Sequence, residues 1–154
     1  MYIKSIVQQI LMRATALKDK YTKEHNAMAV WVCVFAQSDD EYQQLLTEAK
    51  KLGDIFEETA NGPKFLLNQP IAGTVRILKI RQPDPDKTER GDADFTISDY
   101  KAFKKEQAGQ ANFKIIPKDN FEMMELMEPG ATVRAYFSYP SIEEQYQDLF
   151  LNNF

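Results

Sequence analysis

The sequence has little of several residues that would mark a specialised protein. One cysteine and one histidine occur among 154 residues, which excludes a disulfide-bonded scaffold and a zinc site made of several Cys and His ligands. The longest apolar run, 27–36, has ten residues, whereas a membrane-spanning helix needs about 20. The N-terminus also lacks the basic and apolar regions of a secretory signal. We therefore expect a cytoplasmic protein that does not bind a membrane.

Positive charge is not in excess either. Nineteen Lys and Arg residues stand against 23 Asp and Glu residues, for a formal net charge of -4. Because a general phosphate-binding surface needs clustered cations, nucleic acid is not an expected partner. The length suits one domain, 1–154, that buries its core without disulfides or metals. Whether the chain forms a homodimer stays open.

The first half of the chain has alternating helix and strand signals. Apolar residues recur at three- and four-residue steps from Ile3 to Leu17, which predicts an amphipathic helix within 1–22. The apolar run at 27–36 predicts a buried strand around Cys33, whose thiol we expect to pack as a small hydrophobe. A capping box at Ser38 then opens a helix, and Gly53 is predicted to take the left-handed conformation after its end. Three predicted strands complete the unit, at 54–58, 64–68 and 74–81.

The second half repeats this order after a proline-containing connector, 82–87. A strand at 93–98 and a helix after Ser98 precede three more strands, at 113–116, 121–127 and 132–137. Short segments recur in the same order: Ser38-Asp39 as Ser98-Asp99, Pro70 as Pro129, and Thr74-Val75-Arg76 as Thr132-Val133-Arg134. These recurrences predict an internal duplication of a βαβββ unit, over 27–82 and 93–138, with a C-terminal helix and tail at 141–154.

Two βαβββ units in one small chain resemble the vicinal-oxygen-chelate superfamily, which includes glyoxalase I, extradiol dioxygenases and bleomycin resistance proteins. The N-terminal helix and the segments 62–65 and 139–144 are similar to those of YecM-type bacterial proteins. The resemblance implies an α+β fold in which both units form one curved, mostly antiparallel sheet, with helices outside and a ligand cleft on the concave face. Function varies widely among proteins that share a fold.

Enzymes of that superfamily hold a divalent metal with His and Glu or similar groups from the first and last strand of each unit. Here His25 precedes the first predicted strand in a polar run, and the cations of strand 74–81, Arg76, Lys79 and Arg81, oppose a divalent ion. Asp94 is the one carboxylate placed to serve as a ligand. We therefore expect no metal and no cofactor.

Alternation in the strands suggests residues that bind a ligand. Asp94 faces the cleft if Phe95 faces the helices, and Arg134 and Tyr136 do so if Phe137 packs inward. The repeat places Arg76 like Arg134, so two arginines and an aspartate could hold an anion. They could equally satisfy one another as structural ion pairs. Trp31 could form an aromatic wall, although core packing is the favoured interpretation.

The predicted function is binding of a small polar or anionic molecule between the two halves without a metal. The residues expected to bind it are Trp31, Arg76, Asp94, Arg134 and Tyr136. One alternative is a metal-dependent lyase, isomerase or dioxygenase of the same superfamily, and another is a protein-interaction domain. No catalytic residues can be named, because no Ser-His-Asp, Cys-His or phosphate-loop pattern is present.

Overall fold

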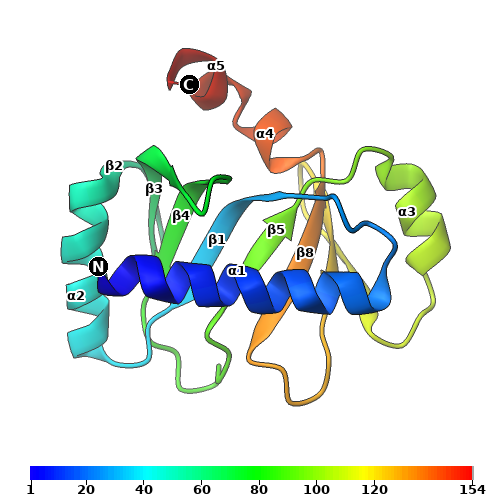
Figure 1. The fold of residues 1–154 in the computed structure, drawn as a ribbon, viewed down its shortest axis with the longest axis horizontal. Coiled ribbons are helices and arrows are strands. Elements are labelled where there is room, and N and C mark those ends of the chain that lie inside the picture. The colour runs from blue at the N-terminus through cyan, green and yellow to red at the C-terminus, as the bar shows by residue number, and fades with distance from the viewer. Residues whose placement is uncertain (154) are drawn as a thin grey trace.

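The computed structural model describes residues 1–153 and begins with one long helix. This helix, α1 (Tyr2–Tyr21), buries a stripe of apolar side chains, as the three- and four-residue spacing predicts. It lies across one face of the sheet and packs on β1, β5 and β8 (Figure 1). The buried stripe consists of Ile3, Ile6, Val7, Ile10, Ala14 and Leu17.

Eight strands form one sheet in the order β2-β3-β4-β1-β5-β8-β7-β6. Two pairs at the centre are parallel, β1 with β4 and β5 with β8, and every other pair is antiparallel. In the first unit the strands are β1 (Ala29–Phe35), β2 (Gly53–Thr59), β3 (Gly62–Ile71) and β4 (Val75–Arg81). In the second they are β5 (Gly91–Phe95), β6 (Phe113–Pro117), β7 (Glu122–Leu126) and β8 (Val133–Tyr139).

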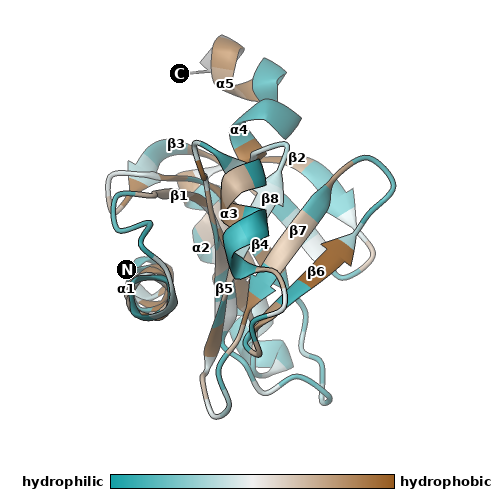
Figure 2. Cartoon of the chain, turned by 90° about the vertical axis from the view of Figure 1, so that its right-hand side faces the viewer, coloured by the Kyte–Doolittle hydropathy of each residue, from teal (hydrophilic) through white to brown (hydrophobic). Residues whose placement is uncertain are grey.

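The predicted fold is confirmed: an α+β chain with an N-terminal helix, two βαβββ units and one curved, unclosed sheet. The unit helices are α2 (Asp39–Leu52) and α3 (Tyr100–Gln107). Ser38 caps α2 by accepting from the backbone N–H of Glu41, and Asp99 caps α3 by accepting from that of Ala102. In the side view, α1 lies on one side of the central strands while β6, β7 and β2 curve toward the other (Figure 2).

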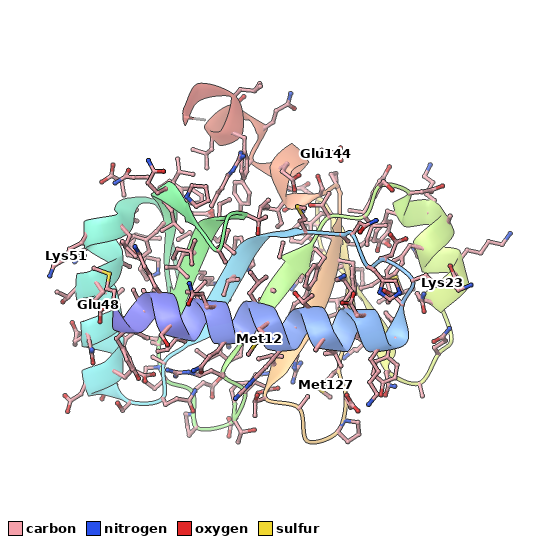
Figure 3. The ribbon with its side chains drawn as sticks, viewed as in Figure 1. Met12, Lys23, Glu48, Lys51, Met127 and Glu144 are labelled. Atoms are coloured by element: carbon pink, nitrogen blue, oxygen red, sulfur yellow. The ribbon has the colours of Figure 1, made fainter. Side chains whose placement is uncertain are left out.

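The main apolar core lies between the helices and the convex face of the sheet. Alternate residues of the central strands enter it, including Val32, Leu78, Ala93 and Phe137. The opposite side of α1 faces solvent, where Met12 is 65% exposed (Figure 3). No helix within residues 1–153 is long and apolar enough to cross a membrane.

Several predicted boundaries need correction. Gly53 is not left-handed: its φ is -179°, and it starts β2 directly after the helix. Glycine is needed there for space, since an added Cβ would lie 2.1 Å from the backbone oxygen of Leu66. β3 is longer than predicted and continues through Pro63 and Pro70, and β5 begins two residues before the predicted strand at 93.

The C-terminal segment leaves the sheet after β8 as two short helices, α4 (Ile142–Gln145) and α5 (Gln147–Asn153). Both lie beyond the same end of the central strands, and Glu144 marks the first of them (Figures 1 and 3). Ser141 caps α4 by accepting from the backbone N–H of Glu144, which is the capping box that the sequence predicts. The predicted tail also includes residue 154, which is outside the described residues.

Candidate ligand cleft

A cleft of about 270 Å³ lies on the concave face of the sheet, where the two units meet. The four central strands form its floor, and α4 with Tyr146 closes one side. Among its lining residues, Trp31, Cys33 and Phe35 come from β1, Lys79 and Arg81 from β4, Asp92 and Asp94 from β5, and Tyr136 and Ser138 from β8.

Strand pairing arranges the floor in rows. In one row Lys79 lies opposite Cys33, Cys33 opposite Asp92, and Asp92 opposite Arg134. In the next row Ile77, Trp31, Asp94 and Tyr136 follow one another in the same way. Because side chains alternate along a strand, these residues share the concave face while their neighbours enter the core.

Two buried carboxyl groups, those of Asp92 and Asp94, lie in the floor on β5. Burial raises the pKa of Asp92 to about 7, and the charge of Asp94 adds to the rise, while Lys79, Trp31 and Arg81 oppose it. Burial likewise raises the pKa of Asp94 to about 7, with hydrogen bonds from Ser138 opposing the shift. At neutral pH the two carboxyl groups together therefore hold about one proton. The pair can both donate and accept a hydrogen bond.

Three cations approach the cleft from the first unit. Lys79 is half-buried, burial lowers its pKa, and among the described residues no hydrogen bond or ion pair reaches its ammonium. Arg81 lies 3.5 Å from Asp84 and covers the ring of Phe35, but its Nε is buried without a hydrogen-bond partner. Lys64, in contrast, is paired with Glu57 at 2.7 Å.

The side wall comes from the C-terminal segment. The ring of Tyr146 stacks on Trp31 with centroids 6.5 Å apart and meets Phe56 edge-on at 5.5 Å. The hydroxyl of Tyr146 accepts a hydrogen bond from Lys64 Nζ at 2.9 Å. The wall is therefore held by aromatic packing and by one polar contact.

The structure brings Trp31, Asp94 and Tyr136 together in the cleft lining, and it does not place the two predicted arginines there. Arg134 binds Glu125 at 2.9 Å and also Glu89, so its guanidinium serves ion pairs beside the cleft. Arg76 lies near the start of β4, 5.5 Å from the ring centroid of Phe150.

Sequence reasoning missed several lining residues. Asp92 was left out of the strand predicted from 93, although the alternation of acidic and apolar residues in 91–95 extends back to it and could have revealed it. Lys79 and Arg81 were considered only as charges that oppose a metal. Ser138 and Tyr146 carry no sequence signal, because they reach the cleft only through the fold of the C-terminal segment.

The lining does not suit the divalent metal of the superfamily's enzymes. The strands that would supply its ligands are β1, β4, β5 and β8, and they offer a thiol, two cations and two carboxylates of one strand. Burial raises the pKa of the Cys33 thiol well above its usual value, which disfavours a thiolate ligand. No group of three or more potential His, Cys, Asp or Glu ligands occurs in the part of the chain that the structure describes.

Comparisons with known proteins concern the fold. No family model and no curated protein matches the chain. A solved structure described as "Structural Genomics, Protein EC4020" has a TM-score of 0.68 at 12% identity and covers 92% of this chain and 88% of its own. A glyoxalase/bleomycin resistance protein/dioxygenase superfamily member from Vibrio splendidus 12B01 has a TM-score of 0.49 at 8% identity, over 73% of this chain and 97% of its own. The first likeness shows that the fold of this chain occurs in another protein.

Proposed function

We propose that this chain is a vicinal-oxygen-chelate domain, related to YecM-type proteins, that binds a small anionic molecule in its cleft without a metal. The observation that carries the proposal is Lys79, a half-buried ammonium with no bonding partner among the described residues. Burying a charge without a partner is unfavourable, so an anion beside Lys79 would be stabilising. The unpartnered Nε of Arg81, in the same lining, offers a second donor.

The surroundings support a small organic anion rather than an inorganic one. Trp31, Phe35 and Tyr146 line the cleft and give it apolar walls, which suit a hydrocarbon or aromatic body. A volume of about 270 Å³ is near the lower end for ligand sites. The ligand is therefore of the size of one substituted ring, with a carboxylate directed at Lys79.

A thermal-shift screen of small carboxylates tests this function. A ligand at 100 times its dissociation constant stabilises the folded state by about 2.7 kcal/mol, which raises the melting temperature measurably. Lys79→Gln should abolish the shift, while Lys101→Gln, a change of an exposed lysine on α3, should leave it intact. The screen is run with and without EDTA. If no carboxylate shifts the melting temperature, the binding proposal fails, and a shift lost with EDTA and restored by Mn²⁺ would overturn the metal-free site.

A further inference from the structure

The two ends of the cleft differ in charge. Its basic end carries Lys79 and Arg81 of β4, where the Lys79 ammonium and the Nε of Arg81 have no hydrogen-bond partner among the described residues. At its other end the charge of Glu143, on α4, raises the pKa of Asp94, and Thr96 Oγ1 donates a hydrogen bond to the same glutamate. Lys118 also lines the cleft, but it is exposed in the turn between β6 and β7. A simple anion would use only the basic end.

The distance between the two ends follows from the sheet. β4 and β5 lie on either side of β1, and neighbouring strands are spaced by about 4.8 Å, so their backbones are roughly 10 Å apart. Trp31 and Cys33 form the floor between them. The side chains of Lys79 on β4 and Asp94 on β5 shorten the distance between the two charged groups below that between the backbones. The remaining distance matches a small molecule with a charge at each end.

We propose that the ligand is a zwitterion, an amino carboxylate whose carboxylate binds Lys79 and Arg81 and whose ammonium binds Asp94, with Glu143 nearby. This inference rests on the proposed function and adds a second charge to the ligand. The ring of Trp31 lies under the middle of the molecule. The acidic end would distinguish such a ligand from a plain carboxylate, which leaves Asp94 without a cation.

Protonation gives the zwitterion a signature of its own. Burial raises the pKa of both Asp92 and Asp94 to about 7, so each carries a proton for part of the time at neutral pH. An ammonium favours the ionised carboxylate and should release protons on binding, whereas a plain carboxylate adds negative charge and should cause proton uptake. The other charged or titratable groups around the pair are Cys33, Lys79, Arg81, Tyr100, Arg134, Tyr136 and Glu143.

Three matched compounds separate the charges of the ligand. In 4-(aminomethyl)benzoate both charges are present, in 4-methylbenzoate the amine is missing, and in 4-methylbenzylamine the carboxylate is missing. We expect 4-(aminomethyl)benzoate, or L-phenylalanine with its shorter charge spacing, to bind at least tenfold more tightly than either single-charge compound in isothermal titration calorimetry. Titrations at pH 7 in phosphate and in Tris, which differ in ionisation enthalpy, give the number of protons released.

Variants then assign the two ends. Asp94→Asn should remove the tenfold preference and the proton release while 4-methylbenzoate still binds. Asp119→Asn, an exposed control in the β6–β7 turn, should change neither. Glu143→Gln, a change of a half-buried helix residue, should weaken the preference if Asp94→Asn does not fold. Equal binding of 4-methylbenzoate and both zwitterions would overturn this inference and leave the proposed function standing; binding by none of these compounds, nor by any carboxylate of the screen, would overturn both.

Discussion

Tyr146 stacks on Trp31, with interplanar angle 15° and centroids 6.5 Å apart, so the segment after the second unit forms a wall over the first strand of the first unit. The chain has one tryptophan, which makes its fluorescence a direct report on this wall. Tyr146 also accepts a hydrogen bond from Lys64. The wall is therefore also held to β3, which carries Lys64.

We predict that Tyr146→Ala shifts the emission of Trp31 to longer wavelength, because the indole loses an aromatic cover and meets more water. The melting temperature should fall by only a few degrees, since the main core lies on the other face of the sheet. Tyr146→Phe is the matched control, because it keeps the ring and removes the hydroxyl. An unchanged emission maximum in Tyr146→Ala would show that the wall does not stay on Trp31 in solution.

Arg134 is predicted to be structural. Its guanidinium is 19% exposed and binds Glu125 and Glu89, so removing it leaves two carboxylates close together in a largely buried place. We expect Arg134→Ala to lower the free energy of unfolding by about 3 kcal/mol, measured by urea denaturation.

The double variant Glu125→Gln with Arg134→Ala tests the same ion pair. We expect the double variant to lose less free energy of unfolding than the two single variants lose together. The reason is that the second substitution no longer breaks an intact ion pair. Lys101→Ala, on the exposed side of α3, is the control for loss of a cation. Additive costs would mean that the pair contributes nothing in solution.

The sequence was sufficient for the order of elements and for part of the cleft. Periodicity, caps and the recurrence of short segments predict the helices and both units, because these signals are local. Alternation around Phe95 correctly directs Asp94 to the concave face. Trp31 could not be assigned from strand 27–36, since that run is apolar on both faces.

The arginines show why the rest was out of reach. Arg134 finds its partners 45 and 9 residues away, at Glu89 and Glu125. The pairing of Arg134 with Glu125 depends on the register of β7 and β8. The internal duplication does not predict this register. Asp92 was missed because the predicted strand began at 93, two residues after the start of β5, although the alternation in 91–95 reaches back to it.

Gly91 provides a test of how closely the two units approach. An added Cβ at this position would lie 2.1 Å from the backbone oxygen of Cys33. Cys33 lies on β1, the strand of the first unit that pairs with β5 of the second. We expect Gly91→Ala to separate β1 and β5 locally and to lower the melting temperature by several degrees. Thr132→Ala, a change of an exposed residue just before β8 that removes only a surface hydrogen bond from Arg13, should have a much smaller effect. A melting temperature for Gly91→Ala equal to that of the wild type would show that the strands can move apart without cost.

The last prediction concerns pH and the carboxyl pair. Asp92 has a pKa of about 7 in the folded chain, well above the value near 3.9 of an unfolded aspartate. Between about pH 4 and pH 7 the folded state therefore binds more protons at this residue than the unfolded state does. It follows that this residue's contribution to the free energy of unfolding falls as pH rises through that window and is constant above it. The same sign holds for Asp94.

Replacing one carboxyl group isolates this contribution. Asp92→Asn does not titrate, so its free energy of unfolding relative to the wild type should rise between pH 4 and pH 7 by an amount on the order of a few kcal/mol. Glu41 changes stability in the opposite direction but in a lower window, because its pKa is lowered to about 2 by Arg90, Tyr2 and Gln37 against the effect of burial. Urea denaturation at pH 4, 5, 6, 7 and 8 measures the difference, with Asp119→Asn as the exposed control. A difference between Asp92→Asn and the wild type that does not vary with pH would mean that Asp92 is ionised throughout this range.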